Sequence, residues 1–106
     1  MRLPIERSSQ CQDSSGRLYR WEISVRLMPA NELYPEGVKA VFRLIRFELN
    51  YRSKDQVVLL IDNHAPYGFH EHDLLPQNHS SRRKLNVETW QTALVYFQER
   101  CKEILR

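Results

Sequence analysis

The sequence predicts an α+β domain in which an antiparallel sheet of three to four strands packs against one C-terminal amphipathic helix. Three observations lead to this prediction. Residues 18–28 alternate between apolar and polar side chains, residues 57–61 form a continuous apolar run, and residues 86–105 carry apolar side chains at helical spacing. Because 106 residues is the length of one domain, we expect a single domain over residues 1–106.

The composition, with 42% hydrophobic and 27% charged residues, is typical of a soluble globular protein. No apolar run approaches the roughly 20 residues needed to cross a bilayer. The N-terminal MRLPIERSSQ also lacks the apolar centre of a secretory signal. We therefore expect no membrane association and a cytoplasmic location. The net charge of +3 permits binding to nucleic acid or to an acidic protein without identifying either partner.

The first predicted strand follows a polar N-terminal segment. Residues 8–16, SSQCQDSSG, are rich in small polar residues and lack periodicity, so we interpret residues 1–17 as a flexible lead-in. Residues 18–28 then predict a half-buried strand. Its apolar face consists of Tyr19, Trp21, Ile23, Val25 and Leu27.

Residues 39–51 combine a weak helical stripe with many β-branched and aromatic side chains, and we interpret them as a strand. Their apolar positions change face, from Ala40, Phe42 and Leu44 to Ile45, Phe47 and Leu49. This change predicts a β-bulge near Leu44 and Ile45. Residues 57–61 should form the most buried strand, and residues 69–74 a short one that completes a sheet within residues 18–75.

The C-terminal segment predicts an amphipathic helix over residues 86–105. Asn86 is a suitable N-cap, and Glu88 would lie in the first turn, where a negative charge is favourable. The apolar stripe consists of Val87, Trp90, Leu94, Phe97, Cys101 and Ile104. We expect this stripe to lie across one face of the sheet.

The candidate site is the segment from Asp62 to Asp73, DNHAPYGFHEHD, which holds three of the four histidines. If residues 69–74 form a strand, its period of two places His70 and His72 on one face. His64 can return to them across the intervening turn. Histidine titrates near neutral pH, so such a cluster is suited to proton transfer, metal binding or anion binding.

The first functional hypothesis is cleavage of RNA by its own 2′-hydroxyl. His70 and His72 would act as general acid and base, with Asp62 orienting one of them. The basic loop that follows would bind phosphate through Arg82, Arg83 and Lys84. Tyr67, in the turn beside the histidines, is the candidate for stacking on a base.

Two other interpretations remain open. His64, His70 and His72, with nearby carboxylates, are suitable ligands for a divalent transition metal, although no recognised motif spacing is present. Alternatively, the histidines are surface residues paired with Glu71 and Asp73. Asp62 and Asn63 have a structural alternative as well, because such residues commonly end strands by binding backbone amides.

The order of these motifs resembles the TumE-like family of small bacterial toxin–antitoxin proteins, over roughly residues 40–105. Tyr51-Arg52 correspond to a YR segment of that family, Asp62-Asn63 to the DN of its RYDNA strand end, and His70 with His72 to its histidine-rich run. The chain differs at Leu60 and Ile61, where the family has an arginine and an aromatic residue, and it has an additional His64. Arg52 or Arg82 would have to replace the missing arginine.

The resemblance implies the toxin component of a two-component system that acts on RNA, with a helix-turn-helix antitoxin as partner. Combined with the histidine pair, it predicts a metal-independent ribonuclease that needs no cofactor. The competing expectation is a non-catalytic protein that binds nucleic acid or a DNA-binding partner through its sheet face and basic loop.

Overall fold

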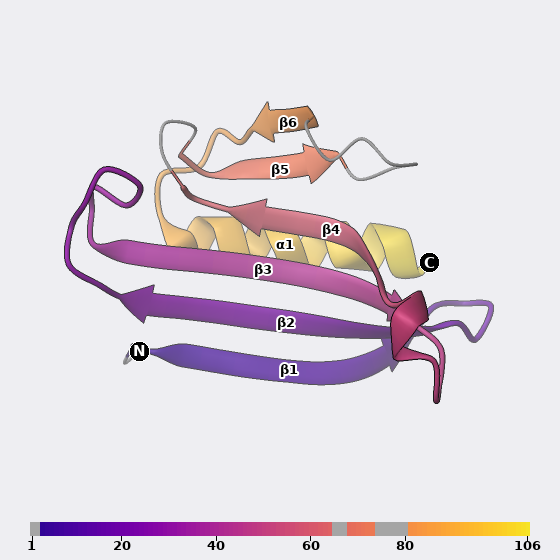
Figure 1. Cartoon of the computed structure of the whole chain (residues 1–106). Helices are drawn as coiled ribbons and strands as arrows, with labels where there is room; N and C mark the ends of the chain where they lie inside the picture. Colours follow the sequence, from indigo (N-terminus) through magenta and orange to yellow (C-terminus); the bar gives the residue numbers. More distant parts are fainter. Residues whose placement is uncertain (1–2, 65–67, 74–80) are drawn as a thin grey trace.

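The computed structural model describes residues 3–64, 68–73 and 81–106, which form an antiparallel sheet of six strands and one C-terminal helix (Figure 1). The strands are β1 (Ile5–Gln12), β2 (Leu18–Leu27), β3 (Val38–Phe47), β4 (Gln56–Asp62), β5 (His70–Asp73) and β6 (Ser81–Lys84). A 3-10 turn, Arg52–Lys54, precedes β4, and the helix α1 covers Trp90–Leu105. Strand order in the sheet follows chain order, so each strand pairs with its neighbour in sequence. The predicted α+β class is confirmed.

The prediction of three to four strands was too low, because β1 and β6 were interpreted as a flexible lead-in and a basic loop. Both are edge strands with little apolar content, and Ile5 is the one buried hydrophobic residue of β1. An edge strand pairs on one side through its backbone, and this pairing does not require alternating apolar side chains. Periodicity therefore does not reveal such strands.

A shift of register between β3 and β4 lies at the predicted position, near Leu44 and Ile45, but the bulged strand is β4 and not β3, for which the bulge was predicted. Leu44 pairs with Leu59, whereas Ile45 pairs with Val57, so Val58 of β4 is the additional residue. The pairing of β3 with β2 continues without interruption through the same region. The bulge therefore turns β4, the strand that carries Asp62.

The prediction that residues 57–61 form the most buried strand was wrong, because β3 is buried more extensively than β4. Up to Leu44, the buried side chains of β3 belong to the main core under α1. Ile45 and Phe47 are also buried but lie outside that core. They lie on the face away from α1, since β3 keeps its period of two. β3 thus buries side chains on both faces of the sheet.

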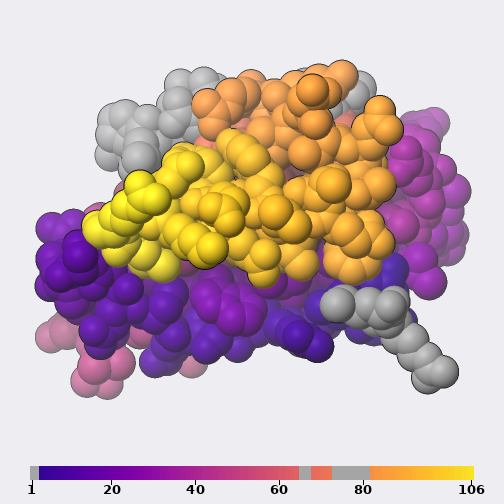
Figure 2. Space-filling view, turned by 180° about the vertical axis from the view of Figure 1, so that it is seen from behind, coloured from indigo at the N-terminus to yellow at the C-terminus, as the bar shows by residue number. Residues whose placement is uncertain are grey.

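The helix α1 packs across β3 and β4 and covers one face of the sheet (Figure 2). Ala93 and Phe97 are its buried residues, and the ring of Phe97 lies 5.6 Å from that of Phe42. The helix starts four residues later than predicted. Thr89, not Asn86, is the N-cap, and its Oγ1 atom accepts a hydrogen bond from the amide of Thr92.

A side chain at the end of β4 ties this strand to β3. Asn63 accepts a hydrogen bond from the amide of Ala40 at 3.0 Å and donates one to the carbonyl of Val38 at 2.9 Å. The structural alternative predicted for Asn63 is therefore confirmed, but its partners are distant in sequence rather than local.

Among the described residues, no helix is long and apolar enough to cross a membrane.

Candidate metal centre

Asp62, His70 and His72 lie on the face of the sheet opposite to α1. In the pairing of β4 with β5, Asp62 is opposite His70, and Leu60 is opposite His72. Residues that are directly opposite in an antiparallel pair project from the same face. The intervening Glu71 points the other way, towards α1, where it contacts Tyr96 and Arg100. The sequence prediction that His70 and His72 share a face is thus confirmed.

The carboxylate of Asp62 is the point on which the histidines converge. Its Oδ1 atom lies 2.6 Å from Nε2 of His70 and 3.5 Å from Nε2 of His72. The rings of His70 and His72 are 4.7 Å apart, and those of His64 and His70 are 5.9 Å apart. One ligand atom from each of Asp62, His64 and His70 lies within 4.8 Å of the other two. We call these three residues the ligand triad.

The backbone next to β5 orients the ring of His70. Nδ1 of His70 lies 2.7 Å from the carbonyl oxygen of Gly68. A carbonyl oxygen only accepts hydrogen bonds, so Nδ1 carries the proton, and in the neutral ring the lone pair is on Nε2. Nε2 is the atom that faces Asp62. Metal-binding histidines are commonly oriented in this way, by donation from the second ring nitrogen to a carbonyl group.

Nε2 of His72 is buried without a hydrogen bond in the described part of the chain, and Oδ1 of Asp62, which is also buried, lies at ion-pair distance from His70 and His72. At 3.5 Å, the contact between Asp62 and His72 is electrostatic rather than a hydrogen bond. Buried polar atoms in folded proteins are normally satisfied, because an unmade hydrogen bond is costly. A carboxylate oxygen and an imidazole nitrogen in this situation suit a shared cation.

The pKa of His72 is lowered from its ordinary value. Burial is the main cause, and the electrostatic interactions of His72 with His70 and Arg82 act in the same direction, while the carboxylate of Asp62 opposes them. His72 is therefore neutral at pH 7. A neutral imidazole can bind a metal ion or accept a proton.

The side chains of the cluster differ in their exposure to solvent. The side chain of His70 has no exposed surface, that of His72 is 10% exposed and that of Asp62 is 20% exposed. His64 is half-buried. A ligand or a water molecule would therefore approach along Asp62 and His64, while His70 is accessible only from within the cluster.

The structure separates the predicted phosphate-binding residues. Arg82 is opposite His72 and Lys84 is opposite His70, so both lie on the histidine face. Arg83 lies on the other face, where its guanidinium group is 3.0 Å from the carboxylate of Glu71. Arg52 is in the 3-10 turn that precedes β4, at the opposite end of this strand from Asp62. Arg83 and Arg52 are thus not brought to the histidine cluster.

Tyr67, the residue predicted to stack on a base, lies outside the described residues. Tyr34, in the connection between β2 and β3, was not predicted as a site residue. Its pKa is raised by burial and by the negative charge of Asp62, which places its hydroxyl group within electrostatic range of the cluster. The sequence carries no signal for this proximity, because a loop of ten residues separates β2 from β3.

Comparison with known proteins adds no relative to this description: no protein-family model matches the chain, and no curated protein or solved structure is detectably similar to it. The functional argument therefore depends on the geometry of the cluster.

Proposed function

We propose that the protein binds a divalent transition-metal ion through Asp62, His64 and His70 and uses it to hydrolyse an anionic substrate. The observation that carries this proposal is the convergence of two imidazoles and a carboxylate within 4.8 Å. Nitrogen ligands with one carboxylate suit zinc, iron, manganese or nickel, whereas calcium and magnesium prefer oxygen ligands.

With Asp62, His64 and His70 as its three protein ligands, the site would resemble catalytic metal sites that keep one position open for water. A bound ion would supply a water molecule that loses a proton near neutral pH. His72 lies outside the triad but 3.5 Å from Oδ1 of Asp62, and its lowered pKa keeps it neutral. We assign to His72 the role of accepting that proton.

The charge around the cluster supports an anionic substrate. Arg82 and Lys84 lie on the same face as the histidines, and both are exposed. A phosphodiester next to the metal ion would be within reach of these cations, which would stabilise the charge that develops during hydrolysis. RNA, the substrate that the sequence predicts, belongs to this class.

The test is a metal titration of protein produced without a histidine tag and treated with a chelator. Zinc, manganese, iron(II) and nickel are added separately, and binding is measured by calorimetry. We expect one bound ion per chain and at least a tenfold loss of affinity in His64→Ala and in Asp62→Asn. Asp55→Asn is the matched control, because Asp55 pairs with Arg20 at the other end of β4.

His72→Gln separates metal binding from catalysis. The variant should bind the ion with nearly unchanged affinity but lose most hydrolysis of bis(p-nitrophenyl) phosphate and of RNA. Circular dichroism of each variant verifies the fold. Absence of stoichiometric binding by all four metals, or equal affinity in His64→Ala and wild type, would rule out the metal centre.

A second candidate is the metal-independent ribonuclease toxin that the sequence predicts, in which His72 is the general base and Arg82 binds phosphate. The observation in its favour is the position of Arg82 opposite His72, where its charge contributes to the lowered pKa of His72. The complete burial of His70 disfavours a direct contact between this residue and RNA. A helix-turn-helix antitoxin remains the proposed partner for this function.

The chelator distinguishes the two candidates. Cleavage of RNA that is unchanged in EDTA, together with loss of growth inhibition in His72→Ala, supports the metal-independent enzyme. Cleavage that disappears in EDTA and returns with one added metal supports the metal-dependent one. Full growth inhibition by both His70→Ala and His72→Ala would exclude the toxin with a histidine pair.

A further inference from the structure

A cavity lies at the end of the sheet away from the ligand triad, where β2 begins and β3 ends. Its volume is about 540 Å³. It is lined by Arg17, Leu18, Arg46, Phe47, Glu48, Leu49 and Lys54. We call it the basic pocket. The strand β4 runs from the pocket to Asp62 of the ligand triad, a distance of about 20 Å for an extended strand.

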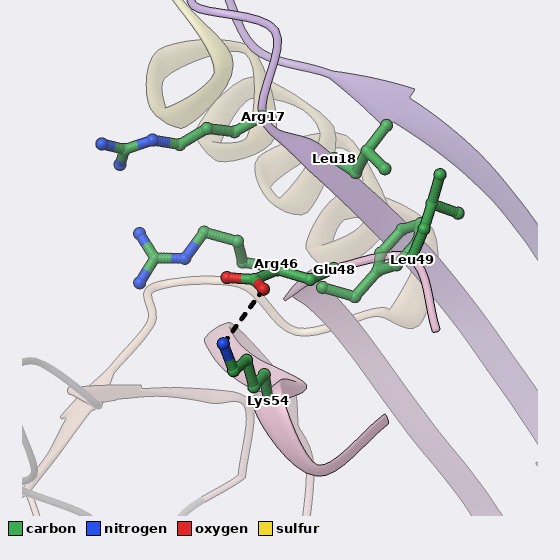
Figure 3. Close-up of a pocket in the computed structure, with 7 residues that line it drawn as sticks. Arg17, Leu18, Arg46, Glu48, Leu49 and Lys54 are labelled. Atoms are coloured by element: carbon green, nitrogen blue, oxygen red, sulfur yellow. Dashed lines mark ion pairs between the residues drawn. The ribbon is translucent and has the colours of Figure 1, made fainter. Parts of the chain in front are cut away.

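The cationic side chains of the basic pocket come from three separate segments. Arg17 precedes β2, Arg46 is near the end of β3, and Lys54 belongs to the 3-10 turn before β4. Figure 3 shows the guanidinium groups of Arg17 and Arg46 extending to the same side, with the ammonium group of Lys54 below them. Three segments distant in sequence thus direct positive charge to one place.

The positive charge of the pocket is only partly neutralised. Lys54 forms an ion pair with Glu48 at 3.3 Å. In the described ranges, 3–64, 68–73 and 81–106, neither Arg17 nor Arg46 forms an ion pair. Nη2 of Arg46 instead donates a hydrogen bond to the side-chain oxygen of Gln56 at 2.7 Å. By contrast, most other arginines of the sheet are paired with a carboxylate: Arg20, Arg26, Arg43 and Arg83.

The opposite wall of the basic pocket is apolar. Leu18 and Leu49 extend away from the two guanidinium groups (Figure 3). Phe47 completes this wall, and Leu49 is 64% exposed although it is a large apolar residue. Leu49 lines the same pocket as the two arginines, so a ligand that extends across the pocket from the guanidinium groups to Leu49 would remove apolar surface from water.

We propose that the basic pocket binds a small phosphate monoester that carries an aromatic or apolar group. The planar guanidinium group binds phosphate through paired hydrogen bonds, and two of them on one side match a dianionic group. The pocket has the volume of a typical small-ligand site, with an apolar wall and a few convergent polar groups. This inference is independent of the proposed metal centre.

The test uses phenyl phosphate as the probe and titration calorimetry as the measurement. EDTA is present, so that phosphate cannot bind through a metal ion. We expect phenyl phosphate to bind more tightly than inorganic phosphate, because only the former is long enough to reach the exposed Leu49. Arg17→Ala and Arg46→Gln should each weaken phenyl phosphate binding about tenfold, through loss of charge-assisted hydrogen bonds.

Two further variants test the contributions of charge and of apolar contact separately. Glu48→Gln removes the carboxylate that competes for Lys54, so phenyl phosphate should bind about threefold more tightly. Leu49→Ala should abolish the preference for phenyl phosphate over inorganic phosphate. Arg7→Ala is the matched control, because it removes one positive charge from the exposed strand β1, away from the pocket.

Two results would contradict phosphate binding in the basic pocket. The proposal fails if phenyl phosphate shows no saturable binding to the wild type. It also fails if Arg17→Ala reduces binding no more than Arg7→Ala does, since the arginines would then act only through net charge. Arg17 is exposed, so its substitution leaves the fold intact and this comparison remains decisive even if Arg46→Gln is unstable.

Discussion

The pairing of β4 with β5 determines where the side chains of the candidate site lie, and Asp62 shows this most clearly. One oxygen atom of Asp62 lies within 3.5 Å of both His70 and His72 because the register places Asp62 directly opposite His70. A shift of one residue would place the carboxylate on the opposite face, under α1. The geometry of the site is therefore a consequence of strand register.

The first residue-scale prediction concerns pH. His72 titrates near pH 6.5 in the unfolded chain and at a lower pH in the folded protein, since burial lowers its pKa. Between these two values the unfolded chain binds a proton that the folded protein does not bind. The free energy of unfolding should therefore decrease as pH falls through 6.5, until pH drops below the folded pKa.

Urea unfolding of the metal-free protein at pH 7.5, 6.5 and 5.5 measures this effect. His72→Gln should show a smaller decrease over the same interval, because glutamine does not titrate. Equal slopes for the two proteins would show that His72 does not contribute to the pH dependence.

The second residue-scale prediction concerns Glu71, a buried carboxylate on the helix side of β5. Burial by itself raises its pKa, but hydrogen bonds from Tyr96, Arg100 and Arg83 outweigh this effect and lower the pKa. Tyr96 donates to Oε1 at 2.6 Å and Arg100 donates to Oε2 at 3.2 Å. The carboxylate thus joins β5, β6 and α1.

Glu71→Gln should reduce the free energy of unfolding by about 2 kcal/mol, because Arg100 loses a buried partner. The reduction should be largest above pH 4.5, where Glu71 is ionised even in the unfolded chain, and should diminish as pH falls through the lowered pKa. Glu103→Gln is the control, since Glu103 forms an exposed pair with Arg100 and its loss should cost under about 0.5 kcal/mol. Equal losses in the two variants would contradict the role assigned to Glu71.

The elements of the sheet are positioned by contacts at their ends, and the end of β4 is an example. The bulge at Val58 turns β4 relative to β3, and Asn63 then fixes the end of β4 against the beginning of β3. Asp62 lies between these two features. Asn63 lies between Asp62 and His64 in the chain, so its hydrogen bonds support the ligand triad although its side chain is not a ligand.

Asn63→Ala should reduce the free energy of unfolding by about 1–3 kcal/mol, because a backbone amide and a carbonyl lose their partners. It should also weaken metal binding, by a smaller factor than Asp62→Asn does. Thermal unfolding and metal titration measure the two effects. Asn31→Ala is the control, because Asn31 makes its hydrogen bonds within an exposed loop. Unchanged metal affinity in Asn63→Ala would show that the hydrogen bonds of Asn63 do not support the metal site.

Over the whole molecule, the strongly patterned elements were predictable and the edges of the sheet were not. The alternation in β2, the helical stripe of α1 and the common face of His70 and His72 follow from side-chain period alone. β1 and β6 are specified by backbone pairing to a neighbouring strand, so their sequences show little alternation between polar and apolar residues. Without β6 as a strand, the sequence could not separate Arg82 from Arg83, although alternation places them on opposite faces.

Side-chain periodicity also could not predict which residues are near in the fold but far apart in sequence. The basic pocket combines Arg17, Arg46 and Lys54, which belong to three segments without any common motif. Arg52 was assigned to phosphate binding as a replacement for the arginine that the chain lacks relative to the family it resembles, but β4 places Arg52 and the histidines at opposite ends of the sheet. Periodicity describes single elements, whereas these sites depend on register and strand direction.

The global prediction is that the metal ion stabilises the whole fold. Because the ligand triad requires paired β4 and β5, the unfolded chain offers no assembled site. At a free metal concentration one hundred times the dissociation constant, the free energy of unfolding should rise by about 2.7 kcal/mol. Scanning calorimetry should show a melting temperature about 10 °C higher for the wild type and unchanged for Asp62→Asn. An increase of equal size in both proteins would assign the effect to another site.

The agreement between strand order and chain order bears on how the protein forms during its synthesis. Each new strand can pair with the strand made immediately before it, so the sheet can grow in the direction of translation. Asp62 and the histidines leave the ribosome only after β1, β2 and β3 are available as a template. We therefore expect the ion to bind after most of the sheet has formed, and to stabilise the completed fold rather than to nucleate folding.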